Sequence, residues 1–209
     1  MDRTIGSVHR RARALYRSFM STPVFRREIA VVMLLALLAG VSVGCAGVTV
    51  FVAADPPTAS AFVPYHSAAG RFTVQVPGVF DETVKTTNNP YLGPIEVHYF
   101  VVAPGGGPRY AVVYGDFPAS YVTSTPLDVI YRESRDGNVG QGRLVESGSR
   151  TVVGRPADEH VVDGTTGLQR FVSVLVGNRL YGLAVRGTDG QIRSPEADRF
   201  IASFAVDPG

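Results

Sequence analysis

The sequence predicts an α+β protein in which a largely antiparallel β-sheet is flanked by helices and preceded by one transmembrane helix. Three observations lead to this fold class. A long apolar run without charged residues occupies residues 29–53, several β-rich segments with short glycine- and proline-rich breaks follow it, and two helix starts interrupt and close that series. A composition of 45% hydrophobic and 18% charged residues is typical of a folded chain.

The apolar run predicts a membrane anchor. With a rise of about 1.5 Å per residue, a helix over residues 29–53 is longer than a hydrocarbon core of about 30 Å. Arg26 and Arg27 precede the run, Asp55 follows it, and the next basic residue is Arg71. The positive-inside rule therefore predicts a single-pass protein of the cell membrane, with a cytoplasmic N-terminus and an extracytoplasmic C-terminal domain.

Two forms of processing compete with a retained anchor. Ala53 and Ala54 could form a signal-peptide cleavage site, although the apolar run is long for a secretory signal. Cys45, the only cysteine, ends a Val-Gly-Cys sequence that resembles the end of a lipobox and is a candidate lipidation site. Ser42 stands where a large aliphatic residue is usual, and the apolar run continues beyond Cys45, so a cysteine buried in a membrane helix is the preferred interpretation.

The chain divides into four parts. We expect a basic cytoplasmic tail at 1–28, the transmembrane helix at 29–53, a Pro/Ala/Ser-rich linker at 54–69 and the extracytoplasmic α+β domain at 70–207. The tail has seven arginines and two acidic residues, whereas the rest of the chain has 13 basic and 16 acidic residues. Because recognition of a nucleic-acid duplex needs a clustered cationic face, this balance argues against a nucleic-acid partner for the domain.

The first half of the domain predicts four strands. Residues 71–76 alternate apolar and polar side chains, and a second short strand is expected at 83–87. The β-rich runs at 95–102 and 110–114 are separated by a Pro-Gly-Gly-Gly-Pro loop, which predicts a β-hairpin. A helix should follow, with Thr125 as N-cap, Pro126 as its first residue and Gly137 at its end.

The second half predicts an antiparallel meander closed by a helix. Strands are expected at 143–153, 157–162, 168–176 and 179–186, joined by short connections. The last two are the most apolar and should be central, with a tight turn at Gly177 and Asn178. A helix begins at Ser194-Pro195, and its apolar face, which should cover the sheet, consists of Phe200, Ile201 and Phe204.

Four short patterns resemble those of the PsbP-like superfamily over residues 70–206. They are Arg71–Pro77 (RFTVQVP), Gly154–Glu159 (GRPADE), Val176–Leu183 (VGNRLYGL) and Arg199–Phe204 (RFIASF). This resemblance implies an α-β-α sandwich whose relatives are mostly non-catalytic accessory or binding proteins, among them an extrinsic photosystem subunit and a nuclear transport cofactor. No functional residue of the family transfers to a numbered position here, and nothing in the chain supports a photosynthetic role.

The most compact group of acid and base side chains is Asp158-Glu159-His160. Because neighbouring strand residues point to opposite faces, Asp158 and His160 can share one face. A serine such as Ser173 could then complete a hydrolytic arrangement, so a cell-envelope hydrolase is one alternative, although no nucleophile elbow is visible. The four histidines are too dispersed for a metal cluster, and the sequence predicts neither a metal nor a cofactor.

The preferred functional hypothesis is a membrane-anchored binding or accessory module that is not an enzyme. Its partners would be the lipid bilayer and an envelope protein or a small ligand. The candidate contact surfaces are a loop with Tyr91 and Leu92 and the segment from Phe117 to Tyr121, where aromatic side chains lie among Pro, Ser and Gly. Ordinary loop packing explains the same residues, and a purely structural envelope protein is a further alternative.

Overall fold

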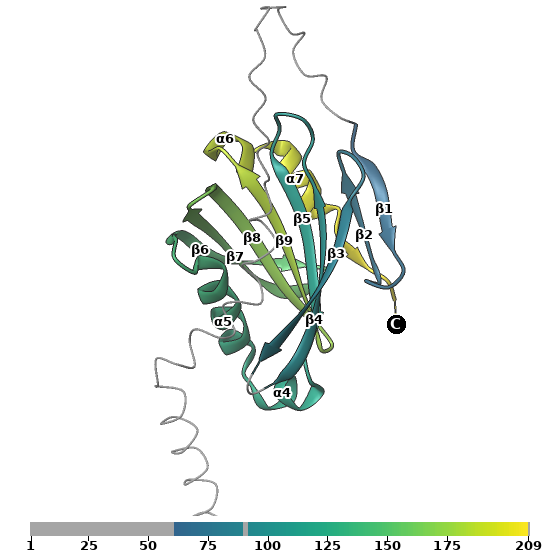
Figure 1. The fold of residues 1–209 in the computed structure, drawn as a ribbon, viewed down its shortest axis with the longest axis vertical. Helices are drawn as coiled ribbons and strands as arrows, with labels where there is room; N and C mark the ends of the chain where they lie inside the picture. Colours follow the sequence, from purple (N-terminus) through teal and green to yellow (C-terminus); the bar gives the residue numbers. More distant parts are fainter. Residues whose placement is uncertain (1–60, 90–91, 209) are drawn as a thin grey trace, which may run out of the picture.

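Two antiparallel β-sheets form the body of the protein (Figure 1). The computed structural model describes residues 61–89 and 92–208. The larger sheet has seven strands in the order β3-β4-β5-β9-β8-β7-β6. These strands are β3 Asp81–Asn89, β4 Gly93–Val102, β5 Arg109–Asp116, β6 Arg143–Val152, β7 Arg155–Gly164, β8 Gly167–Val176 and β9 Arg179–Gly187. The predicted α+β class with a largely antiparallel sheet is confirmed.

The meander predicted for the second half is present as β6 to β9. Each of these strands pairs antiparallel with the next, and β9 then pairs with β5, so that β9 is the middle strand of the sheet. β8 and β9 are joined through Gly177, whose φ of 63° lies in the left-handed region that glycine tolerates. The predicted tight turn and the interior position of β8 and β9 are therefore confirmed.

A second, three-stranded sheet has the order β1-β2-β10 and packs on one face of the larger sheet. It consists of β1 Val63–Ser67, β2 Phe72–Val76 and β10 Ala205–Val206. β1 lies within the range 54–69 that the sequence predicted as linker, so the domain begins earlier than expected. Pro64 obscured the strand, but β1 is an edge strand, where the missing N–H of proline is tolerated.

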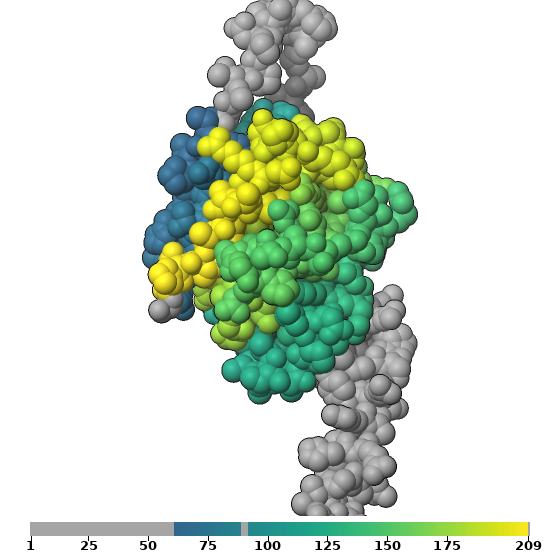
Figure 2. All heavy atoms as spheres, turned by 180° about the vertical axis from the view of Figure 1, so that it is seen from behind, coloured from purple at the N-terminus to yellow at the C-terminus, as the bar shows by residue number. Residues whose placement is uncertain are grey.

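Four helices are described, namely α4 Ala119–Ser124, α5 Leu127–Val139, α6 Asp189–Ile192 and α7 Pro195–Ala202. α7 begins as predicted: Ser194 is its N-cap, the Ser194 hydroxyl accepts a hydrogen bond from the Ala197 N–H, and Pro195 follows. Phe200 and Ile201 of α7 are buried in the main core, as expected. Figure 2 shows the C-terminal segment with α7 and β10 (yellow) running beside β1 and β2 (blue).

The ends of α5 differ from the prediction. Thr125 does not cap α5 but ends α4, a short helix that the sequence did not predict, and Pro126 takes the N-cap position without a side-chain hydrogen bond. Gly137 does not end α5 either. It is buried inside the helix, which continues to Val139. The C-cap residue is Gly140, which has a φ of 50°. A small residue at position 137 lies on the buried side of α5, and this packing outweighs the helix-breaking tendency of glycine.

Phe72 of β2 lies at the centre of the aromatic core between the two sheets. Its ring centroid is 5.2 Å from that of Phe100, 5.8 Å from that of Phe204 and 6.4 Å from those of Tyr114 and Tyr181. Its side chain is completely buried. Most of these ring pairs meet edge to face, which is the arrangement that aromatic quadrupoles favour. One side chain of the small sheet therefore contacts β4, β5, β9 and the segment after α7.

Arg179 fastens the turn between β1 and β2 to the large sheet. Its guanidinium forms two 2.7 Å hydrogen bonds with the carboxylate of Asp116 and donates to the carbonyl oxygens of Ala69 and Gly70. It also lies 4.4 Å from the centre of the Tyr114 ring. These bonds hold the pKa of the Asp116 carboxyl below its usual value, because the guanidinium stabilises the charged form.

The predicted anchor lies outside the described residues. This applies to the tail at 1–28, the transmembrane helix at 29–53 and the candidate lipidation site Cys45. Within the described ranges, none of the helices has the length and apolar character needed to cross a bilayer.

Truncating Phe72 should destabilise the domain strongly. We expect Phe72→Ala to lower the free energy of unfolding by about 3–5 kcal/mol, since it removes a fully buried ring and leaves a cavity between the sheets. Val79→Ala is the control, because Val79 is 87% exposed and should change that free energy by less than about 0.5 kcal/mol. Urea unfolding followed by circular dichroism measures both, and similar values for the two variants would contradict the central position of Phe72.

Candidate functional site

The acidic and basic side chains of β7 are divided between the two faces of the large sheet. Asp158 and His160 point toward α5, whereas Glu159 points to the opposite face, as strand alternation requires. Their exposure differs accordingly: the His160 side chain is fully buried and that of Asp158 is 8% exposed, whereas that of Glu159 is 26% exposed. The predicted trio therefore belongs to two separate sites.

The first site is a polar cluster beneath α5, which we call the α5 cluster. Its members come from α5, β7 and β8, and they are Ser134, Arg135, Asn138, Asp158, His160 and Ser173. Asp158 accepts a 2.8 Å hydrogen bond from Arg135 and lies 2.8 Å from Nδ1 of His160. Nε2 of His160 lies 3.2 Å from the side-chain amide of Asn138. Both nitrogens of His160 therefore have partners.

Ser173 belongs to the α5 cluster but contacts a different partner. The sheet register places Ser173 directly opposite Asp158, and its hydroxyl lies 3.4 Å from that of Ser134. Ser173 is 1% exposed, and the ring of His160 stacks on Phe171 at 5.2 Å. The side chains that the hydrolase hypothesis requires thus lie on one face, but they are enclosed between helix and sheet, with the two ring nitrogens of His160 directed at Asp158 and Asn138.

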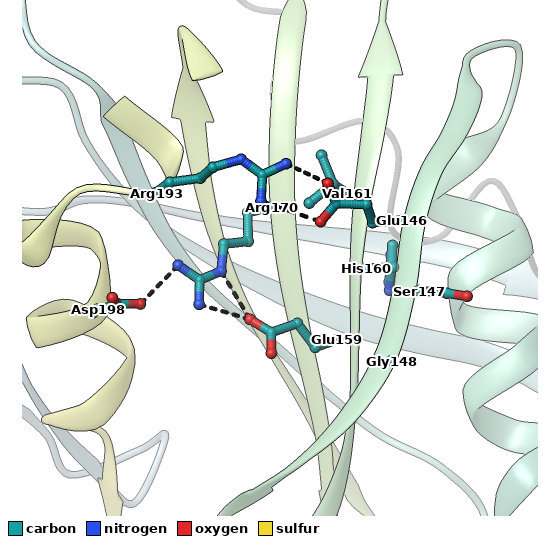
Figure 3. Close-up of a pocket in the computed structure, with 9 residues that line it drawn as sticks. All are labelled: Glu146, Ser147, Gly148, Glu159, His160, Val161, Arg170, Arg193 and Asp198. Atoms are coloured by element: carbon teal, nitrogen blue, oxygen red, sulfur yellow. Dashed lines mark hydrogen bonds and ion pairs between the residues drawn. The ribbon is translucent and has the colours of Figure 1, made fainter. Parts of the chain in front are cut away.

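The second site is an open pocket on the opposite face of the sheet, and we call it the charged pocket (Figure 3). It has a volume of about 400 Å³ and lies where the main core ends, between the β6–β7 edge and the C-terminal helices. Residues of β6, β7, β8, α6 and α7 and their junctions line it, and they are Glu146, Ser147, Gly148, Glu159, His160, Val161, Arg170, Arg193 and Asp198. Figure 3 shows the side chains of Ser147 and His160 directed toward α5, so these two residues line the pocket with their backbone.

Ion pairs between distant parts of the chain organise the charged pocket. Arg170 lies between Glu159 and Asp198, with contacts of 2.8 Å to each carboxylate, and its Nη1 donates to the carbonyl oxygen of Ile192. Arg193 forms two hydrogen bonds with Glu146, of 2.5 and 3.1 Å. The pocket therefore offers both signs of charge, held by strands on one side and helices on the other.

The two arginines of the charged pocket differ in accessibility. The Arg170 side chain is 14% exposed. Burial lowers its pKa, but hydrogen bonds to Asp198 and Glu159 outweigh this effect, so that the pKa lies above the usual value. Arg193 is 41% exposed, and hydrogen bonds to Glu146 and Asp189 raise its pKa. The same contact with Arg193 lowers the pKa of Glu146. Arg170 is thus a fixed part of the wall, and Arg193 is the accessible cation at the opening.

The predicted aromatic contact surface is divided between loop packing and a short helix. Tyr91 lies outside the described residues, and Leu92 and Phe117 pack, half-buried, against a small cluster on the α5 face of the sheet. Tyr121 lies in α4, its ring centroid is 5.4 Å from that of Phe117, and its hydroxyl donates a 2.6 Å hydrogen bond to Glu133. Burial raises the pKa of the Glu133 carboxyl, and the bond from Tyr121 opposes this. Packing accounts for these described contacts.

Sequence reasoning found Glu159 but missed Arg170, Arg193 and Asp198. Their spacing along the chain has no motif, because contacts up to 47 residues apart bring these side chains together. One available signal was Arg170 itself, a charged residue within the apolar strand β8. A charge in that position needs a partner, which predicts an acidic side chain nearby but not its position in the chain.

A comparison with solved structures finds similar folds. The protein resembles cyanobacterial PsbP. The solution structure of this protein (CyanoP) from Synechocystis sp. PCC 6803 matches with a TM-score of 0.48 and 12% sequence identity, over 75% of this chain and 98% of that chain. The match is a likeness of fold, and no residue role is carried over. No family model and no curated protein matches the chain.

Removing the carboxylate of the α5 cluster should destabilise the fold. We expect Asp158→Ala to lower the free energy of unfolding by about 3–5 kcal/mol, because it leaves the half-buried Arg135 and the buried His160 side chains without their shared acceptor. The control is Asp163→Ala, whose ion pair with Arg143 is exposed and should contribute less than about 1 kcal/mol. Urea unfolding at neutral pH compares them, and an unchanged stability in Asp158→Ala would show that the cluster is not a structural network.

Proposed function

We propose that this protein is a membrane-tethered binding module that faces the outside of the cytoplasm and recognises a charged segment of an envelope protein through the charged pocket. One observation carries the proposal: the pocket is open to solvent and presents side chains of both charge signs beside each other. Binding sites combine concave shape with a few polar groups in fixed positions. The ion pairs of the pocket supply these positions.

The exposed pair of Arg193 and Glu146 supports exchange with a partner. Exposed ion pairs contribute little to stability, about 0–1 kcal/mol, because water and salt screen them. A carboxylate of the partner can therefore replace Glu146 at the Arg193 guanidinium with little loss of stability. A basic group of the partner then pairs with the Glu146 carboxylate. Arg170 keeps the wall in place during this exchange, since it is held by Glu159 and Asp198.

The proposed tether is the apolar run at 29–53. Its length and the arginines before it support a single-pass anchor with the domain outside the cytoplasm. A tether confines the domain to the layer next to the membrane and so raises its effective concentration toward envelope partners. At this effective concentration, a pocket that binds its partner only weakly is sufficient to form the complex.

A hydrolase that uses Asp158 and His160 is the second candidate. It is supported by the 2.8 Å contact between the two side chains, which is the arrangement that orients a histidine as a general base. Access of a substrate requires α5 to move, because α5 supplies Asn138 and Arg135 to the same side chains. The charged pocket requires no such movement, and for this reason we prefer the binding module.

The topology can be tested with reporter fusions at the C-terminus of the full chain. We expect alkaline phosphatase, which is active only outside the cytoplasm, to be active in this fusion, and a fusion to a fluorescent protein that folds only in the cytoplasm to remain dark. Deleting residues 29–53 should reverse both results, because this removes the signal for membrane insertion. A bright, phosphatase-negative full chain would overturn the proposed location.

The role of the charged pocket can be tested by crosslinking the full-length protein in native membranes and capturing it for mass spectrometry. We expect a specific envelope protein, and we expect Arg193→Glu to reduce its recovery about tenfold, since like charges then meet at the opening of the pocket. The matched control is Arg132→Glu, a charge reversal at a similarly exposed arginine on α5. Equal recovery with both variants, or no specific protein with the unaltered chain, would refute binding through this pocket.

A further inference from the structure

The outer edge of β6 is an unpaired sheet edge ten residues long. β6 ends the seven-stranded sheet, and among the described residues only β7 pairs with it. All but two of its residues are exposed. Such an edge carries a row of free N–H and C=O groups that can pair with another strand, unless proline, charge or covering elements prevent it. β6 contains no proline, and its middle consists of the small residues Ser147, Gly148 and Ser149.

The charges on β6 are complementary to themselves. Glu146 and Arg150 lie on either side of Gly148 and share the face of the charged pocket, as their opposite residues Val161 and Ala157 show. If a second β6 runs antiparallel with its Gly148 opposite this Gly148, each Glu146 faces the partner's Arg150. Arg150 contacts Glu159 through Nη1, and its side chain is 27% exposed, so part of its guanidinium remains accessible to a second carboxylate. Glu146 contacts Arg193 but is 53% exposed and can also face the partner.

The exposed apolar side chains at the two ends of β6 come near each other in the same register. Leu144 and Val145 at its start are 40% and 37% exposed, and Val153, just after its end, is 36% exposed. The antiparallel register places the partner's Val153 opposite Arg143, next to Leu144. Val153 also has a φ of 46°, which is an unusual conformation for a β-branched residue. Glycine or asparagine would fit this position of the two-residue turn better.

The backbone of β6 permits this register. Val152 and Arg155 are opposite each other and flank a two-residue turn, so their backbone groups bond to one another across the hairpin. Because bonding alternates along an antiparallel strand, Ser147, Ser149 and Thr151 direct their N–H and C=O groups away from β7. In the proposed register Ser147 is opposite the partner's Ser149. Their outward-directed N–H and C=O groups can therefore form hydrogen bonds with each other on both sides of Gly148.

We propose that two copies of this chain associate through antiparallel pairing of their β6 strands around Gly148. The two seven-stranded sheets then form one continuous sheet. Antiparallel pairing keeps equivalent faces on the same side, so the two charged pockets lie next to each other and are separated only by the paired β6 strands. This goes beyond the proposed binding function, because it assigns a self-association surface and makes the module bivalent.

Site-directed disulfide crosslinking tests the register. Opposite residues that do not exchange backbone bonds lie about 4.5 Å apart at their Cα atoms, which is within the range of a disulfide. We expect Gly148→Cys, in full-length protein whose Cys45 is replaced by serine, to form a disulfide dimer in membranes under mild oxidation. A Cβ at position 148 has no atom within 4 Å, so the substitution fits. The control Val84→Cys is on the opposite edge of the sheet, is 54% exposed and should remain monomeric.

Edge and charge variants test the same surface without cysteine. Ser149→Pro should abolish the dimer of the full-length protein in sedimentation experiments, because proline blocks an outward-facing N–H, whereas Ser149→Ala should preserve it. Glu146→Arg should weaken association roughly tenfold, since two like-charged pairs replace two complementary ones. Adding Arg150→Glu to that variant should restore association, because the charges are exchanged but remain complementary.

The outcomes separate this proposal from the pocket function. A Gly148→Cys crosslink together with a monomeric Ser149→Pro variant of unchanged circular dichroism supports the β6 dimer. Monomeric wild-type protein in membranes, equal crosslinking of Gly148→Cys and Val84→Cys, or failure of the charge exchange to restore association overturns it. Arg193→Glu removes the contact of Arg193 with Glu146 of β6, so dimerisation is measured in this variant as well. A loss of the captured partner with an intact dimer identifies a pocket effect and not a dimer effect.

Discussion

The fold depends on burying one face of the large sheet under the aromatic side chains that surround Phe72. A seven-stranded sheet has two faces to cover, and this chain has no long helix among its described residues for that purpose. A short three-stranded sheet takes this role, assembled from the beginning and the end of the domain. Large rings make it sufficient, because each aromatic side chain removes much apolar surface from water. The remaining edge of the same face stays open and forms the charged pocket.

Local sequence signals predicted the regular elements well, because their causes are local. Alternating apolar residues located the strands of the meander, and Ser194 with Pro195 located the start of α7. The failures have tertiary causes. β1 contains Pro64 and is a strand only because β2 and the aromatic core accept it, and α5 continues past Gly137 because that glycine packs against the sheet. The second sheet could not be read from any single segment.

The two candidate sites differ in how much of them the sequence revealed. Strand alternation alone predicted that Asp158 and His160 share a face, and they do. It gave no indication that Arg135 and Asn138, each 22 or 23 residues before the strand residue it contacts, would enclose them. Among the charged side chains of the charged pocket, only Glu159 was noticed, because Arg170 and Asp198 meet through the arrangement of β8 and α7 and not through spacing. Long-range ion pairs decide both sites.

The order of the small sheet has a mechanical consequence. β2 lies between β1 and β10, so the first and the last strands of the described chain are bonded to the same central strand. A force applied at Val63 along the direction of β1 loads all five residue pairs between β1 and β2 in shear. The hydrogen bonds of these pairs must then break together and not one after another. If a force acts on the N-terminal end of the domain, the β1–β2 pair, which is closest to that end, would thus resist extension.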